Sequence, residues 1–187
     1  SERLGGTCLL RGCIPTKAML QTAELVDKMS HGEDFGVAAE GVAVDMDKMA
    51  AFRDKNITKN ANGVGYLMKK NDIDVHWGHG RLGDEGEVTV EKEDGSTDTL
   101  QTDHAILATG SACGGLPFIE EDGERILNSD QLLQKTEVPE HLVILGAGAV
   151  GVEYGSCFRS YGSEVTIIEM MDHIVPLEDE EVSKELE

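Results

Sequence analysis

Two cysteines near the start of the chain, Cys8 and Cys13, are close enough in sequence to act together. The remaining cysteines, at positions 113 and 157, are distant, and this uneven spacing fits neither a secreted disulfide scaffold nor a zinc site. A close pair in an otherwise thiol-poor chain is more often redox-catalytic than structural. Spacing alone also allows the alternative of two unpaired cysteines buried near a helix start.

The residues between the two cysteines decide whether a disulfide can form. In an undistorted helix, positions five apart have Cα atoms roughly 8 to 9 Å apart, beyond the limit of about 7 Å for a disulfide. A disulfide therefore requires a distorted turn, and Gly12 is well placed to provide it. Cys13 precedes a predicted first helical turn, whose backbone N–H groups favour a thiolate, and Arg11 and Lys17 add positive charge. Both thiols are therefore predicted to be reactive.

A glycine-rich segment, GAGAVG at residues 146–151, follows an apolar strand and opens a predicted helix. In this context Gly146 permits a tight turn, Gly148 lets the backbone approach a pyrophosphate, and Gly151 allows close packing of helix on strand. Glu169 ends the next strand, near the spacing of about 20 residues at which a carboxylate reaches the adenosine ribose. The set predicts a dinucleotide site that prefers NAD to NADP, against the alternative of a glycine turn that binds no nucleotide.

Hydrophobic periodicity predicts the elements that must position these segments. Helical spacing indicates two long helices, the second loosened at Gly63 and Gly65, and alternation indicates a small antiparallel insertion with a turn at residues 93–96. A strand, glycine turn, helix and strand follow as one βαβ half-unit. The predicted fold class is α/β, with doubly wound dinucleotide-binding domains that are present only in part. The predicted helices span 14–30, 45–71, 129–135 and 152–162, and the strands span 73–82, 87–95, 97–110, 142–145 and 164–169.

The composition limits the classes of partner. Because 36 acidic side chains outweigh 16 basic ones, the net charge of -20 disfavours nucleic acid and anionic membrane surfaces. No stretch approaches the roughly 18 apolar residues that a membrane helix needs. His76 and His79 have no third partner in sequence, so no metal site is predicted. The chain opens without Met and stops inside a charged segment, which leads us to expect an internal fragment.

Residues 5–17, GGTCLLRGCIPTK, resemble the active-site signature of the disulfide reductase flavoproteins, the class I pyridine nucleotide-disulfide oxidoreductases. Within that family they are most similar to the dihydrolipoamide dehydrogenase group. The segments MKKNDIDVHWGHGRL, AILATGS and GAGAVGVEYGS follow in the order typical of it. The resemblance implies a partial FAD-binding domain at 1–115 that lacks its N-terminal FAD fingerprint, a partial NAD-binding domain at 116–187, and an absent C-terminal dimerisation domain.

The resemblance also implies residue roles. Cys8 would be the interchange thiol that attacks or leaves the lipoyl disulfide, and Cys13 would contact the flavin as the charge-transfer thiolate. Lys17 would pair with Glu153 beside the flavin, where an ammonium stabilises the anionic reduced ring. The residues implied to line FAD are Gly5, Gly6, Thr7, Lys17, Gly80, Thr109, Gly110, Ser111 and Glu153, and those implied to hold NAD are Gly146, Gly148, Ala149, Val150, Gly151 and Glu169.

The implied reaction is oxidation of protein-bound dihydrolipoamide by NAD, through the disulfide and FAD. The implied partner is the lipoyl-bearing acyltransferase of a 2-oxoacid dehydrogenase complex or a lipoyl carrier protein, with a homodimer as the assembly. The location would be cytoplasmic in a bacterium or the mitochondrial matrix in a eukaryote. A proton-accepting His-Glu pair would lie in the absent domain, so none of the 6 histidines is assigned that role.

Some residues depart from the family's usual pattern. Residues 10–11 are Leu-Arg where Asn-Val is more usual, Thr16 stands where Ser is commoner, and residues 113–115 are Cys-Gly-Gly where larger side chains are usual. The closest rival is a related mercuric or glutathione reductase-like enzyme, although Glu169 argues against the NADP-linked members. A second alternative, from a different class, is an inactive nucleotide-binding fragment.

Overall fold

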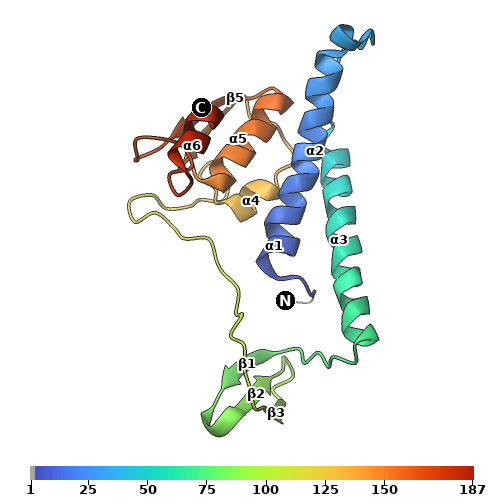
Figure 1. The fold of residues 1–187 in the computed structure, drawn as a ribbon, viewed down its shortest axis with the longest axis vertical. Coiled ribbons are helices and arrows are strands. Elements are labelled where there is room, and N and C mark those ends of the chain that lie inside the picture. The colour runs from blue at the N-terminus through green and yellow to red at the C-terminus, as the bar shows by residue number, and fades with distance from the viewer. Residues whose placement is uncertain (1–2) are drawn as a thin grey trace.

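The computed structural model describes residues 3–187, so the predicted segment 1–115 begins with two residues outside the described part. Its largest feature is an antiparallel pair of helices, α2 (Cys13–Ser30) and α3 (Met46–Lys70) (Figure 1). Asp45 caps α3, because its side chain accepts from the backbone N–H of Lys48 at 3.1 Å. The predicted loosening of this helix at Gly63 and Gly65 is wrong, since α3 runs unbroken through both. A glycine costs a helix only about 1 kcal/mol, which a long cooperative helix tolerates.

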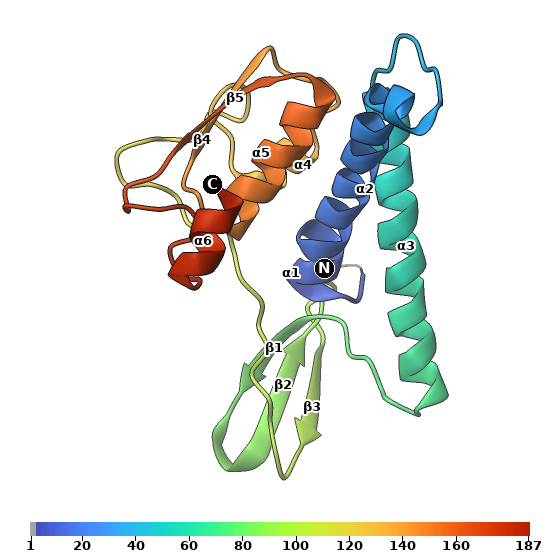
Figure 2. The same ribbon diagram turned by 45° about the horizontal axis from the view of Figure 1, so that its top comes forward.

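A parallel pair of strands forms the second unit. Strands β4 (His141–Leu145) and β5 (Glu164–Ile168) are joined by α5 (Ala149–Tyr161), which confirms the predicted βαβ half-unit. Helix α5 lies between this sheet and α2 (Figure 2). A Cβ added at Gly155 would lie 3.1 Å from the Cδ1 atom of Ile167, so this glycine permits the close approach of helix to sheet.

The core forms where α5 meets the helix pair. Phe158 and Cys157 are fully buried there, and the Tyr161 hydroxyl donates to the Met19 carbonyl of α2 at 2.7 Å. Burial raises the pKa of the Cys157 thiol to about 12, so this cysteine stays a neutral core residue at physiological pH. The segment that bears Cys8 and Cys13 is therefore anchored to the half-unit that bears the glycine motif.

The small antiparallel sheet contains β1 (His79–Leu82), β2 (Glu87–Glu91) and β3 (Thr97–Gln101). The insertion is confirmed, but the predicted strands were too long, since β1 begins six residues later than 73 and β3 ends at Gln101 instead of 110. The reason is pairing: Thr102 donates to the carbonyl of Gly86 at 3.0 Å, and within residues 3–187 no strand lies opposite 104–110. Alternation of side chains alone does not form a strand without a partner.

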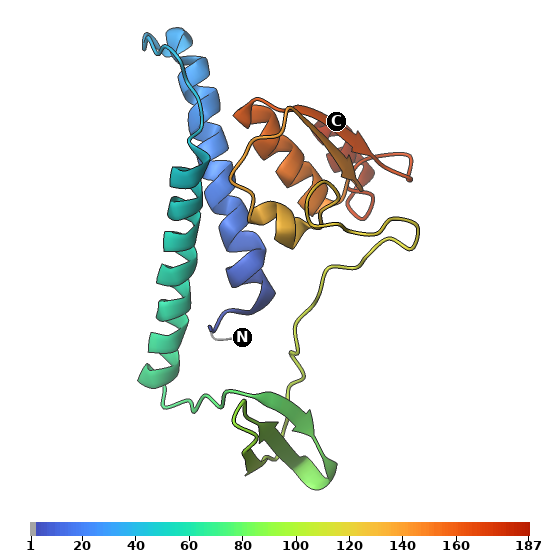
Figure 3. The same ribbon diagram turned by 180° about the vertical axis from the view of Figure 1, so that it is seen from behind.

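An extended segment runs from β3 to the short helix α4 (Ser129–Leu133) (Figure 3). A capping box between Asn128 and Gln131 starts α4, close to the predicted start of the helix 129–135. No helix within the described residues is long and apolar enough to cross a membrane. The remaining elements are α1 (Gly6–Arg11), α6 (Glu180–Leu186) and two short 3-10 helices, η1 (Gly32–Phe35) and η2 (Asp84–Gly86).

A buried arginine connects α3 to α4. The Arg53 side chain is 3% exposed, and its guanidinium donates to the carbonyl oxygen of Leu133 and, at 2.8 Å, to Asp54. Arg53→Ala is expected to lower the free energy of unfolding by about 2–4 kcal/mol, because a buried carbonyl loses its donor and a cavity opens. Urea denaturation measures this, with the exposed Lys55→Ala of the same helix as the control. A loss no larger than that of the control would contradict the role given to Arg53.

Candidate functional site

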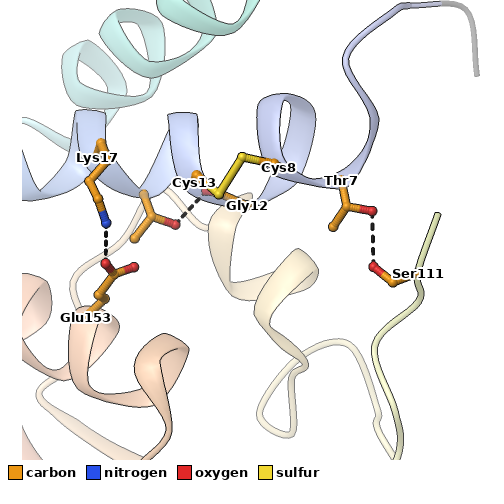
Figure 4. The surroundings of a disulfide bond; sticks show 8 residues. Thr7, Cys8, Gly12, Cys13, Lys17, Ser111 and Glu153 are labelled. Atoms are coloured by element: carbon orange, nitrogen blue, oxygen red, sulfur yellow. Dashed lines mark hydrogen bonds and ion pairs between the residues drawn. A yellow bond between two sulfur atoms is a disulfide. The ribbon is translucent and has the colours of Figure 1, made fainter. Parts of the chain in front are cut away.

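The two cysteines are brought together by a break between α1 and α2. Helix α1 ends at Arg11, α2 begins at Cys13, and Gly12 between them has non-helical angles. The Cα atoms of Cys8 and Cys13 are therefore 4.8 Å apart and the sulfur atoms form a disulfide (Figure 4). A continuous helix would hold them roughly 8 to 9 Å apart. The distorted turn that the spacing requires is thus present.

Gly12 makes this turn possible through close contact with the backbone. A Cβ atom at this position would lie 3.1 Å from the carbonyl oxygen of Thr7 and 3.2 Å from the Cα atom of Cys8. The hydroxyl of Thr16 donates to the Gly12 carbonyl at 2.8 Å and so holds the first turn of α2 in place. The disulfide is accessible, since both cysteines are exposed.

The predicted pairing of Lys17 with Glu153 is present. The ammonium of Lys17, on α2, donates to the Oε1 atom of Glu153, on α5, next to the disulfide (Figure 4). The two side chains are 60% and 31% exposed, so the ion pair contributes little to stability. The pair places one positive and one negative charge where α2 meets α5, one helical turn beyond Cys13.

The residues predicted to line FAD come together only in part. The hydroxyl of Ser111 donates to the hydroxyl oxygen of Thr7 at 3.2 Å, which joins the segments 5–17 and 109–111 (Figure 4). Gly5, which precedes α1, and Gly6, its first residue, adopt positive φ angles, and Gly110 has a φ angle of 88° in the extended segment. Gly80 lies in β1 opposite Val90, and no described contact links it to the other residues of the set.

The glycine turn has a shape that suits a dinucleotide. Gly146 has a φ angle of 102°, and its N–H donates to the Ile168 carbonyl at 2.8 Å. A Cβ at Gly151 would collide with the Gly146 carbonyl oxygen, whereas one at Gly148 would have nothing within 4 Å. The turn is thus closed at Gly151 and open to solvent at Gly148, Ala149 and Val150, where α5 begins. Backbone N–H groups at such an exposed helix start bind phosphate.

Glu169 has a role that the sequence did not predict. Its carboxylate accepts from the backbone N–H groups of Ala147 and Met170, both at 2.7 Å, and of Met171 at 2.9 Å. These bonds, that of Ala147 foremost, lower the pKa of Glu169 below its ordinary value, so it remains a carboxylate. It therefore ties the end of β5 to the glycine turn. An ionised carboxylate has about four acceptor positions, which leaves capacity for a ribose hydroxyl.

Arg11 connects the disulfide turn to two distant segments, and these partners were not predicted from the sequence. Its guanidinium donates to Asp130 of α4 at 2.6 Å and to the carbonyl oxygen of Ser111. Contacts across 100 or more positions leave no periodic signal in a single sequence. No group of three or more ligand side chains that could hold a metal ion is found within residues 3–187.

Known proteins that resemble this chain in sequence are redox enzymes of the kind that such a disulfide and glycine turn indicate. A family model described as pyridine nucleotide-disulphide oxidoreductase matches residues 2–187. Dihydrolipoyl dehydrogenase of Bacillus subtilis is 42% identical over 194 residues, an alignment that covers 100% of this chain and 41% of that protein. Dihydrolipoyl dehydrogenase 3 of Pseudomonas putida is 42% identical over 188 residues, covering 98% of this chain and 40% of that protein.

A solved structure is similar to this chain over its whole length. The crystal structure of LpdA from Mycobacterium tuberculosis superimposes with a TM-score of 0.89 at 26% identity, covering 100% of this chain and 41% of that one. The predicted α/β fold class, with partial dinucleotide-binding domains, is confirmed by this likeness. The chain spans about 41% of the length of these relatives. With the family model covering nearly every residue, the chain belongs to the pyridine nucleotide-disulphide oxidoreductase family.

Proposed function

We propose that the full-length protein oxidises protein-bound dihydrolipoamide with NAD, through the Cys8–Cys13 disulfide and FAD. The observation that carries this proposal is the accessible disulfide at the helix break, with the Lys17–Glu153 ion pair beside it. Relatives that share 42% of the residues are named dihydrolipoyl dehydrogenases, which supports the choice of substrate. A disulfide that is accessible and close to positive charge is suited to exchange with another thiol.

The proposed chemistry begins at sulfur. A thiolate of dihydrolipoamide attacks the Sγ atom of Cys8, so that a mixed disulfide forms and Cys13 leaves as a thiolate. The second lipoyl thiol then attacks the lipoyl sulfur of the mixed disulfide, which releases oxidised lipoamide, and its proton passes to the leaving Cys8 sulfur. Two electrons and one proton have moved from the substrate monoanion to the protein, which leaves Cys8 as a thiol and Cys13 as a thiolate. The positive charge of Lys17 favours the thiolate of Cys13 in this state.

The cofactors have separate proposed places. FAD, when bound, would accept the electron pair from the dithiol and pass it on to NAD. Thr7, Ser111 and Lys17 would hold FAD, and the open turn at Gly148 would hold the NAD pyrophosphate. We propose that residues 1–115 belong to the FAD-binding domain and 116–187 to the NAD-binding domain. The exposed apolar face of β4 and β5, which includes Val143 and Ile168, fits a sheet that is covered on both sides in the whole protein.

The proposed setting follows from the reaction. The substrate would be a lipoyl group on the acyltransferase of a 2-oxoacid dehydrogenase complex or on a lipoyl carrier protein. We propose a homodimer, in the cytoplasm of a bacterium or the mitochondrial matrix of a eukaryote. Size-exclusion chromatography with light scattering tests the assembly, and a monomeric active enzyme would contradict it.

A steady-state assay of the purified full-length protein tests the proposed function. The expected result is reduction of NAD by dihydrolipoamide, with little activity when NADPH and glutathione disulfide or mercuric ion are supplied instead. The opposite preference would assign the protein to a different member of the family. Absence of every disulfide-linked activity, with nucleotide binding retained, would support the inactive nucleotide-binding alternative.

Glu169 is proposed to select NAD by accepting from the ribose hydroxyl and repelling a 2′-phosphate. Replacing Glu169 with Ala and the exposed Met170 with Arg is expected to reduce the preference for NAD over NADP by about 10- to 100-fold in kcat/KM. Glu169→Gln is the matched control, because it retains an acceptor for the Ala147 N–H while losing the charge. An unchanged preference in the double variant would contradict this role of Glu169.

A further inference from the structure

The structure assigns a positioning role to Arg11: its guanidinium, held by Asp130 and the Ser111 carbonyl, supplies the positive charge that activates the Cys8 thiol. This inference rests on the proposed dithiol chemistry and adds a residue to it.

Arg11 lies at the end of α1, in the short segment of chain that joins the two reactive cysteines. It is three residues after Cys8 on α1, a spacing that puts the two side chains on one face of the helix with Cβ atoms about 5–6 Å apart. It is also two residues before Cys13, on the other side of the Gly12 break. A positive charge fixed on the same helix face as a cysteine favours the thiolate form of that cysteine.

The guanidinium is fixed at two points. Asp130, in the first turn of α4, accepts from it at 2.6 Å, and the two side chains are 29% and 40% exposed, for Asp130 and Arg11 respectively. The carbonyl oxygen of Ser111 accepts from the other terminal nitrogen. Ser111 also donates to Thr7, one residue before Cys8, so α1 is held to residue 111 at both of its ends. An arginine with two anchors holds its charge in place better than a freely moving surface side chain does.

The variants proposed below leave the other charged groups near α1 unchanged. Lys17 of α2 is paired with Glu153 of α5, one turn beyond the disulfide. Helix α3 also packs on α1, and Arg3 and Lys69 line a pocket between the start of the chain and α3. Neither Arg11 nor Asp130 belongs to that pocket.

Removing the charge of Arg11 and removing the charge of Asp130 are expected to shift the pH midpoint of Cys8 alkylation in opposite directions. Arg11→Met removes the positive charge and is expected to raise the pH midpoint for Cys8 alkylation by about half a pH unit. Asp130→Asn removes the opposing negative charge while the Ser111 carbonyl still holds the guanidinium, so the midpoint is expected to fall. Arg11→Lys retains the charge, so its midpoint is expected to lie close to that of the unaltered protein. A purely structural contact would not produce shifts of opposite sign.

The experiment uses the full-length protein, reduced and then alkylated with iodoacetamide at pH values from about 5 to about 10, a range that covers the titration of a thiol. Fragmentation mass spectrometry assigns the alkylated cysteine. Arg159→Met, on the outer part of α5, makes the same change in net charge and is the matched control. An unchanged midpoint in Arg11→Met, or shifts of the same sign in Arg11→Met and Asp130→Asn, would overturn the inference. Because alkylation needs no flavin, NAD or lipoamide, these outcomes are independent of whether the proposed enzymatic function holds.

Discussion

Replacing either Cys8 or Cys13 with serine is expected to abolish NAD reduction by dihydrolipoamide in the full-length protein, with kcat falling by about 10⁴-fold or more. The reason is that a hydroxyl cannot form the disulfide that stores the electron pair, and the Cys8–Cys13 pair is the only disulfide within the described residues. Stopped-flow or steady-state absorbance at the NADH wavelength measures the loss.

Two controls separate loss of sulfur chemistry from loss of fold. Electron transfer from NADH through FAD to an artificial one-electron acceptor needs no dithiol, so it is expected to persist in both serine variants. Cys113→Ser changes an exposed free cysteine that lies outside the disulfide, and it is expected to keep full activity. If Cys8→Ser retained more than a tenth of the lipoamide activity, the proposed thiol exchange would be wrong.

The second large effect is expected at the glycine turn. Gly151→Val places a branched side chain where even a Cβ would collide with the Gly146 carbonyl oxygen, so the turn must open. We expect the Kd for NADH to rise by about 100-fold or more, which corresponds to about 3 kcal/mol, and the thermal midpoint to fall. Isothermal titration calorimetry and thermal denaturation measure the two effects.

Gly148→Ala is the matched comparison for Gly151→Val. A Cβ at position 148 has nothing within 4 Å, so the thermal midpoint is expected to stay unchanged while NADH binding weakens through contact with the pyrophosphate. If Gly148→Ala bound NADH as tightly as the unaltered protein, the pyrophosphate would not lie over this glycine. If Gly151→Val did so, the turn at 146–151 would not be the nucleotide site.

The half-unit around the glycine motif was predictable because its signals are local. Strand, glycine turn and helix each have a short-range pattern, and the predicted helix 152–162 differs from α5 chiefly at its start. The distorted turn at Gly12 was also predictable, because helix geometry alone excludes a disulfide between positions five apart. These features depend on residues that are close in sequence.

Features that depend on distant partners were not predictable. The strand expected to run to residue 110 ends at Gln101, because pairing within the described residues stops there. Arg11 was recognised as a nearby charge, but its contact with Asp130 spans 119 positions. Glu169 was predicted to reach a ribose, and its bond to the N–H of Ala147 depends on how β5 meets the turn. Side-chain identity predicted the chemistry of these residues but not their partners.

The most direct test of the proposed enzyme is peptide mapping of the full-length protein, isolated oxidised and alkylated before digestion, together with its absorbance spectrum. We expect a single cross-linked fragment that joins Cys8 to Cys13, bound flavin, and a new long-wavelength absorbance band upon two-electron reduction that is absent from Cys13→Ser. Free thiols at both positions 8 and 13, with no bound flavin, would contradict it.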